Sequence, residues 1–164
     1  MSGPPFLRPA LPTDTPAIAE IFMAARATMT YLPRLHTEQE THAYFAPVVA
    51  SQCVIVAVCH SAPDEITGFA AINDHEDEDP SDEHDKKIHL DHLYMKPECF
   101  GEDVGTTLLN AVKTLRHQGF ALWCFQANTD AQRFYERHGL TLAKTTDGRD
   151  NEEKLPDMLY VWAL

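Results

Sequence analysis

Apolar positions along the chain recur at two spacings, that of strands and that of helices. Residues 53–59 (Cys-Val-Ile-Val-Ala-Val-Cys) form a continuous apolar run of strand length, which predicts a strand buried on both faces. After a turn at residues 60–65, residues 66–72 predict its antiparallel partner. Residues 121–125 predict another buried strand, and residues 88–95 alternate between apolar and polar side chains as a strand does.

Helix signals stand between these strands. Thr15 followed by Pro16 is typical of a helix start, because proline at the first helical position gives up no intrahelical hydrogen bond. Thr37 with Glu40 forms a capping-box pair that predicts the start of a second helix. Pro47 lacks a backbone N–H, and we expect it to end or kink that helix.

The second half of the chain continues the alternation. Residues 105–117 predict a third helix that Gly119 ends, and Asn128 predicts the cap of a fourth helix that Gly139 closes. Further strands are expected at residues 6–10, 140–145 and 158–163. The order β-α-α-β-β-β-α-β-α-β-β predicts an α/β (α+β) fold, in one domain over residues 1–164. Its central sheet would be mixed, with about six to seven strands and helices on both faces.

Charge and cysteine content narrow the classes of function. The formal net charge is −12, which disfavours a nucleic-acid partner and favours a cationic one such as an amine. No apolar stretch approaches the roughly 20 residues that span a bilayer, and the first residues lack a secretory signal. The four scattered cysteines are typical of a reduced, cytoplasmic protein. Because the chain has no spanning stretch, we expect no membrane partner.

Much of the negative charge lies in residues 75–85 (His-Glu-Asp-Glu-Asp-Pro-Ser-Asp-Glu-His-Asp). His75 and His84 could be read as metal ligands, but the run has neither EF-hand spacing nor the spacing of a zinc site. We expect a solvated hairpin loop and no metal site.

Residues 95–109 run from a predicted strand into a predicted helix through a turn that holds Gly101 and Gly105. Free N–H groups at a helix N-terminus bind anions, and glycines let a pyrophosphate approach closely. Strand–turn–helix segments with two glycines are common, so this segment alone is equally compatible with a purely structural role.

Several motifs together resemble the GNAT superfamily of N-acetyltransferases. They are Leu93-Tyr-Met-Lys-Pro97, the glycine turn, Leu108-Leu109, Asn128 and Arg133-Phe-Tyr-Glu-Arg-His-Gly139. The ending Asn151-Glu-Glu-Lys-Leu-Pro-Asp-Met-Leu-Tyr160 is similar to that of a bacterial subgroup. The resemblance implies that the middle strands, 88–95 and 121–125, splay apart and that the pantetheine arm of acetyl-CoA enters between them.

The resemblance also implies which residues bind this co-substrate. They are Leu93, Tyr94, Met95, Phe100, Gly101, Glu102, Asp103, Val104, Gly105, Thr106, Asn128 and Arg133. The family loop reads Gln/Arg-x-x-Gly-x-Gly/Ala, whereas this chain has Phe100-Gly-Glu-Asp-Val-Gly105. Carboxylates at Glu102 and Asp103 would repel a pyrophosphate and weaken binding unless they point to solvent.

The expected catalytic residues are Tyr135, His89 and Asp91. By resemblance, Tyr135 is the general acid that protonates the leaving thiolate. His89 is placed to act as the general base with Asp91 orienting it, on the strand face opposite Leu90 and His92. An ordinary polar strand face, with water as the base, is the alternative. Tyr31, His36 and Tyr44 are expected on the acceptor side, and Trp123 and Trp162 in the core.

The sequence therefore predicts an enzyme that moves an acetyl group from acetyl-CoA to a primary amine of a small molecule or peptide by direct attack, with a homodimer possible. Two alternatives stay open. The altered loop could mark a catalytically impaired ligand-binding or regulatory module of the same fold, or the enzyme could use another acyl donor.

Overall fold

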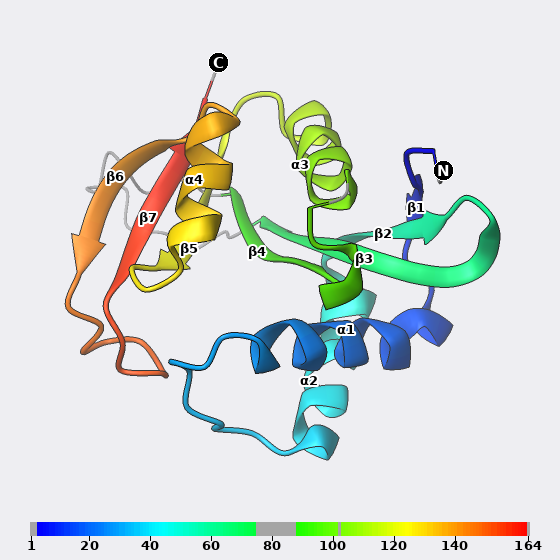
Figure 1. Ribbon diagram of the computed structural model, residues 1–164, viewed down its shortest axis with the longest axis horizontal. Helices are drawn as coiled ribbons and strands as arrows, with labels where there is room; N and C mark the ends of the chain where they lie inside the picture. Colours follow the sequence, from blue (N-terminus) through cyan, green and yellow to red (C-terminus); the bar gives the residue numbers. More distant parts are fainter. Residues whose placement is uncertain (1–2, 75–87, 102, 164) are drawn as a thin grey trace.

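The computed structural model describes residues 3–74, 88–101 and 103–163, so that the acidic run 75–85 and Glu102 lie outside the described residues. Seven strands of the described chain form one sheet in the order β1-β2-β3-β4-β5-β7-β6 (Figure 1). Their bounds are β1 Phe6–Pro9, β2 Cys53–Cys59, β3 Ala62–Asp74, β4 Ile88–Met95, β5 Phe120–Phe125, β6 Thr141–Thr146 and β7 Asp157–Trp162. All neighbouring strands are antiparallel except β4 and β5, which confirms the predicted mixed sheet.

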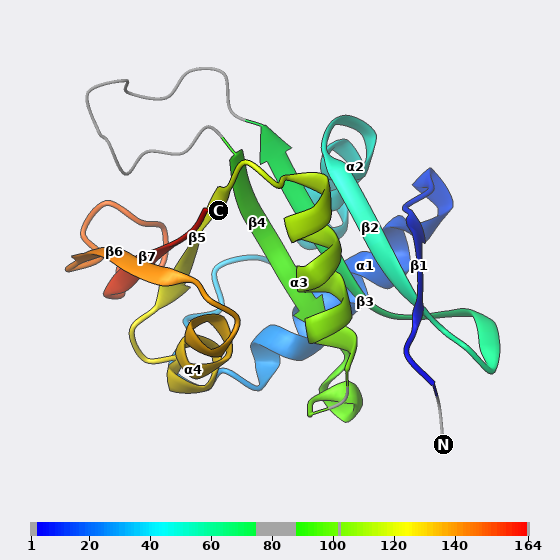
Figure 2. The same cartoon turned by 90° about the horizontal axis from the view of Figure 1, so that it is seen from above.

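Helices lie on both faces of this sheet (Figures 1 and 2). One face carries α1 (Thr15–Ala27) and α2 (Glu38–Ser51), and the other carries α3 (Val104–Leu115) and α4 (Thr129–Arg137). Short 3-10 turns precede α1 and α3 at Pro12–Asp14 and Pro97–Cys99. None of the helices in the described chain is long and apolar enough to cross a membrane.

Two apolar cores hold these layers together. The α3-side core contains residues of β2, β3, β4, β5, β7 and α3, among them Ile55, Ile72, Leu90, Leu108, Leu109, Phe120, Leu122 and Tyr160. The α1-side core contains residues of α1, α2, β2 and β3, among them Ile18, Ile21, Phe45, Val56, Phe69 and Ala71. The α3-side core therefore spans nearly the whole sheet, whereas the α1-side core is confined to the half formed by the earlier strands.

The predicted helix caps are confirmed. Thr37 Oγ1 accepts a hydrogen bond from the Glu40 N–H at 3.1 Å, and Asn128 Oδ1 accepts one from the Ala131 N–H at 3.2 Å. Gly139 follows α4 with a φ of +84°, in the left-handed region that glycine adopts without strain.

Two boundaries differ from the sequence predictions. Of the two alternatives for Pro47, the end of the helix is wrong: α2 continues to Ser51, because Phe45 and Val48 on either side of the proline are both buried in the α1-side core. Tertiary packing thus outweighs the local cost of the missing N–H. The turn expected at residues 60–65 is shorter, since β3 already begins at Ala62 and pairs there with Cys59.

The prediction that Trp123 is a core residue is also wrong. Its side chain is 44% exposed on β5, while Leu122 and Cys124 beside it are buried in the α3-side core. Trp123 faces the other side of the sheet, where the described core of α1 and α2 does not reach β5. Trp162 is half-buried and packs against the α3-side core, as predicted in part.

A β-bulge in β4 changes the predicted faces of that strand. Ala71 pairs with His92, whereas the next residue, Ile72, pairs with Leu90, so Asp91 is the extra residue. Leu90 consequently lies in the α3-side core, and His92 packs against Phe45 on the opposite side. The expectation that Leu90 and His92 share a face is therefore incorrect, because simple alternation fails across a bulge.

Candidate active site

The sheet opens between β4 and β5. The two strands are paired only at His89 and Ala121 in the described chain, and Figure 1 shows them diverging from that end. β4 stays paired with β3 as far as Met95, and β5 stays paired with β7 as far as Phe125. Residues 90–95 and 122–125 are therefore not paired with each other, and backbone groups on these facing edges lack a partner strand. We call this opening the β4–β5 gap.

The N-terminus of α3 lies beside this gap. Its first intrahelical hydrogen bond runs from the Thr107 N–H to the Asp103 carbonyl at 2.9 Å, so the preceding N–H groups have no partner within the helix. Asp103 is exposed, and its side chain makes no capping hydrogen bond to them. This turn, with the N–H groups of Val104, Gly105 and Thr106, has the donors that an anionic group needs.

Gly105 brings α3 close to β4. A Cβ built on this residue would lie 2.8 Å from Met95 Cε and 3.5 Å from Phe134 Cζ. An alanine at this position would require the flexible end of the Met95 side chain to move. Phe100 and Gly101, in the turn before the helix, are exposed, and Gly101 has a φ of +82°.

The other predicted cofactor residues lie on or next to α4. Asn128 is engaged as its cap, and Arg133 is exposed and pairs with Asp130 at 3.3 Å. The Thr106 hydroxyl lies 3.3 Å from His138 Nε2, which ties the start of α3 to the end of α4. The predicted loop, the start of α3 and the end of α4 therefore lie on one side of the gap.

Tyr135 and Cys124 approach the gap from the side of the sheet that carries α3 and α4. Both belong to or pack against the α3-side core. Burial raises the pKa of Tyr135, with smaller contributions from Cys124 and Tyr94. Burial also raises the pKa of Cys124 to about 12, so this thiol stays protonated near neutral pH. The pair offers a phenol that can donate a proton and a thiol that is a poor nucleophile.

The two candidates for the base lie at different places on β4. His89 is at the closed end of the gap, where it pairs with Ala121, and its partner across β3 is Asn73. Asp91 Oδ2 accepts a hydrogen bond from Asn73 Nδ2 at 3.1 Å, so this carboxylate is engaged toward β3. The structure does not bring His89 and Asp91 to the open end of the gap.

Simple alternation along β4 predicted that His92 shares a face with Leu90, but His92 lies on the opposite face. It packs among Phe22, Phe45 and Tyr94, and its Nε2 lies 2.9 Å from the Tyr44 hydroxyl. Burial lowers the pKa of His92 to about 4, so the imidazole is neutral at pH 7. Its Nδ1 is buried without a hydrogen-bond partner in the described chain.

Tyr31 approaches the gap from the face that carries α1. Its ring packs edge-on against Phe125 at 6.2 Å, and Cys124 and Tyr94 are close enough to influence its pKa, which burial raises. Its hydroxyl oxygen is buried and has no hydrogen-bond partner among the described residues. Since Tyr135 is also close to Cys124 and Tyr94, two tyrosines flank the gap from opposite faces.

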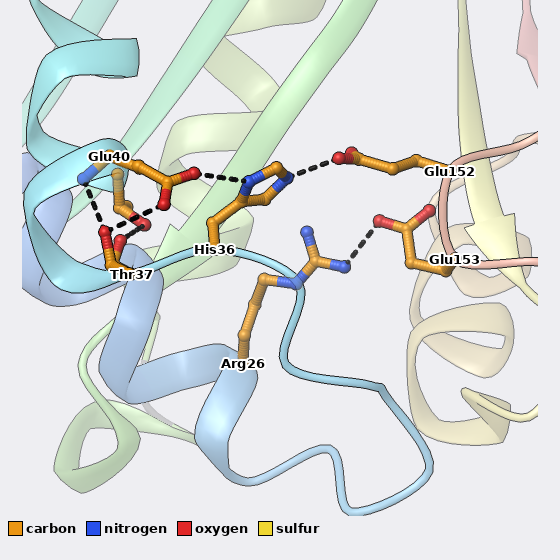
Figure 3. Close-up of polar contacts among 7 residues, drawn as sticks. Arg26, His36, Thr37, Glu40, Glu152 and Glu153 are labelled. Carbon is orange, nitrogen blue, oxygen red and sulfur yellow. Dashed lines mark hydrogen bonds and ion pairs between the residues drawn. The ribbon is translucent and has the colours of Figure 1, made fainter.

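Two ion pairs join the last turn of α1 and the segment that follows it to the β6–β7 loop, residues 147–156 (Figure 3). Arg26 donates to Glu153 at 3.0 Å, and both side chains are mostly buried. His36 lies between Glu40, at 3.3 Å from its Nδ1, and Glu152, which contacts its Nε2. Segments more than 100 residues apart in sequence thereby meet.

The His36 contacts predict a pH dependence. The Glu40 and Glu152 carboxylates raise the pKa of His36 above its ordinary value. A histidine whose pKa is raised on folding contributes stability that is fully present below about pH 6.5 and is lost as the pH rises through the folded-state pKa. In urea unfolding, wild type should therefore exceed His36→Gln in stability by more at about pH 6 than at about pH 9.

The carboxylates supply the control for this measurement. In a Glu40→Gln/Glu152→Gln background, the difference between histidine and glutamine at position 36 should no longer vary with pH in this way. An equal difference at both pH values in the wild-type background would show that these contacts do not hold the proton of His36.

A pocket of about 580 Å³ lies on the same side, next to the end of β5. We call it the acidic pocket; it is lined by Trp123, Phe125, Asp147, Asp150, Glu153 and Asp157, among others. Sequence reasoning missed it, although residues 147–157 contain five carboxylates, four of which line the pocket, and were a readable signal.

Comparisons with known proteins agree with this geometry. The chain matches the model of the acetyltransferase (GNAT) family over residues 18–140. A GCN5-related N-acetyltransferase from Rhodopseudomonas palustris superposes with a TM-score of 0.73 at 24% identity, covering 100% of this chain and 98% of that one. YncA from Salmonella typhimurium, solved with its cofactor acetyl-CoA, superposes with a TM-score of 0.70 at 17% identity, covering 99% and 95%. A search of curated proteins found no significant match.

Proposed function

Because the chain belongs to the GNAT acetyltransferase family, whose co-substrate is acetyl-CoA, we propose that it acetylates a primary amine of a small molecule or a peptide. The observation that carries this proposal is the β4–β5 gap, with unpaired strand edges and a tyrosine on each face. Such an opening costs backbone hydrogen bonds, and a ligand that pairs with the edges compensates for the loss.

The proposed reaction is direct. The lone pair of a neutral amine attacks the carbonyl carbon of the thioester, the new N–C bond forms, and the C–S bond breaks. The sulfur leaves with the bonding electrons and takes a proton from Tyr135, while the amine nitrogen loses one proton. An amide and a free thiol result, and Tyr135 regains its proton from solvent.

Two pKa values favour direct attack over an acyl-enzyme route. The thiol of Cys124 is the one nearest to the gap in the described chain, and its pKa of about 12 keeps it from acting as a nucleophile. The raised pKa of Tyr135 keeps its phenol protonated and ready to donate. We assign removal of the amine proton to water, because His89 lies at the closed end of the gap and Asp91 is engaged with Asn73.

The same elements would hold acetyl-CoA. The backbone groups of Leu93 and Met95 lie on the gap edge of β4 and would hold the pantetheine arm and the acetyl carbonyl, whereas the Tyr94 carbonyl lies toward β3. The N-terminal turn of α3 fits the pyrophosphate. Asn128 caps α4 and Arg133 lies within that helix, on the same face of the sheet as α3.

The first experiment is isothermal titration of the purified protein with acetyl-CoA at moderate ionic strength. Micromolar binding, followed by thiol release with a panel of primary amines, is the expected result. Absence of binding up to millimolar concentration would contradict the proposed function, which requires acetyl-CoA as the donor.

Replacing Tyr135 by phenylalanine tests the acid. We expect kcat to fall about hundredfold or more with acetyl-CoA affinity unchanged, since positioned general acids contribute about 10²- to 10⁴-fold. Tyr160→Phe is a matched control, because the Tyr160 ring lies 6.0 Å from that of Tyr135 but its hydroxyl donates to Glu136. A loss of equal size in both variants would indicate a packing effect and remove Tyr135 from the mechanism.

A further inference from the structure

The acidic pocket adjoins the β4–β5 gap through β5. Its lining includes both Cys124 and Phe125, and the ring of Phe125 also packs against Tyr31. The volume of about 580 Å³ is within the range of small-molecule sites. A ligand with one end at the gap can therefore place its other end in this pocket.

The aromatic part of the pocket already receives cations from the protein itself. The Lys144 ammonium lies 5.6 Å from the ring centre of Trp123, and the Arg26 guanidinium lies 5.9 Å from that of Phe125. Both distances are typical of cation–π contacts. The exposed ring of Trp123, 44% accessible, leaves surface for a further cation.

The polar part of the pocket is formed by carboxylates in different environments. Asp157 accepts from Asn151 Nδ2 at 3.1 Å and Asp147 from Arg149 Nε at 3.1 Å, while Glu153 is paired with Arg26. Asp150 is exposed at the pocket wall. No three His, Cys, Asp or Glu side chains of the described chain are arranged as metal ligands, which favours an organic cation over a metal ion.

The buried, unpartnered hydroxyl of Tyr31, at the β4–β5 gap, is a second and independent observation. A buried hydroxyl without a partner costs free energy, and such groups in native proteins often meet a ligand. This hydroxyl lies near Cys124 and Tyr94, the residues that also neighbour Tyr135. An amine nitrogen in the gap would supply the missing partner.

We propose that the acceptor is a primary amine with a second positive charge, such as a diamine or polyamine. Its reacting amino group meets the Tyr31 hydroxyl at the gap, and its distal ammonium lies in the acidic pocket between Asp150 and the rings of Trp123 and Phe125. The proposal rests on the proposed function, since it names the substrate class of the same site.

Steady-state thiol release tests the distal charge. We compare 1,4-diaminobutane with n-pentylamine, an uncharged-tail analogue of similar length, at matched concentrations of the neutral amine. The diamine should have a kcat/KM at least tenfold higher, and Asp150→Asn should lower the diamine-to-monoamine ratio about fivefold. Asp64→Asn, at an exposed carboxylate on β3 outside the pocket, should leave that ratio unchanged.

Tyr31→Phe tests the proximal end. If the hydroxyl serves the acceptor, kcat/KM should fall about tenfold for both amines while the thermal midpoint stays the same or rises, because an unpartnered buried hydroxyl is removed. A merely structural hydroxyl would give a lower thermal midpoint with kcat/KM unchanged.

The outcomes separate this inference from the proposed function. Equal kcat/KM for the two amines, or a ratio insensitive to Asp150→Asn, would overturn the dicationic acceptor while acetylation itself stands. If acetyl-CoA does not bind at all, titration of the protein with 1,4-diaminobutane still tests the pocket: binding that Asp150→Asn weakens supports it, and no binding at millimolar diamine refutes it.

Discussion

Replacing Gly148 by alanine should lower the free energy of unfolding by about 3 kcal/mol or more, as measured by urea denaturation. Gly148 is buried in the β6–β7 loop and has a φ of +83°, in the left-handed region. An alanine Cβ would lie 2.2 Å from both the carbonyl carbon and the carbonyl oxygen of Leu155. Backbone atoms cannot move aside as a side chain does, so the loop has to open.

Gly139 provides the matched control. It has nearly the same φ, +84°, but a Cβ there would meet no atom within 4 Å. Gly139→Ala should therefore cost only about 1–2 kcal/mol, the conformational part of the effect. Equal losses at the two glycines would show that contact with Leu155 is relieved at no cost. Because the loop of Gly148 carries Asp147 and Asp150, Gly148→Ala should also disturb the acidic pocket.

The second large effect is expected at Phe45 of α2. Its ring is fully buried and packs against Phe22, Phe69, Tyr44 and His92. Phe45→Ala should cost about 3–5 kcal/mol, the range for deleting a buried phenylalanine. Phe6→Ala, at a ring that is 57% exposed, is the control and should cost less than about 1 kcal/mol.

The same substitution has a second readout. Burial among these rings lowers the pKa of His92 to about 4. Removing the Phe45 ring admits water, so an NMR titration should show the pKa of His92 moving up toward 6.5, the ordinary value for histidine. A pKa that stays near 4 in a folded Phe45→Ala protein would mean that another neighbour excludes the water.

The parts of the fold that local patterns control were predictable. Residues 53–59 and 88–95 are strands with those bounds, because continuous or alternating apolar runs leave little choice of register. Thr37 and Asn128 cap helices as their side-chain chemistry requires. Pro47 does not end α2, because the burial of the side chains around it outweighs the low helix propensity of proline.

The candidate site depends more on contacts that are distant in sequence. The loop after β4 was recognisable from its motif, and so was Tyr135. The bulge at Asp91 and the exposure of Trp123 depend on how strands pair and on which half of the sheet a helix covers. The Arg26–Glu153 pair joins residues 127 positions apart, and no local pattern announces it.

The single rung between β4 and β5 makes the two faces of the molecule mechanically unequal. On one face the α3-side core bridges both halves of the sheet and resists their separation. On the other face the apolar core stops before β5, and ion pairs of Arg26 and His36 link the two halves. The two halves of the sheet should therefore separate more easily on the α1 side than on the α3 side. Added salt weakens the exposed His36–Glu152 contact more than the mostly buried Arg26–Glu153 pair, so ionic strength should change how far the two halves of the sheet separate on the α1 side.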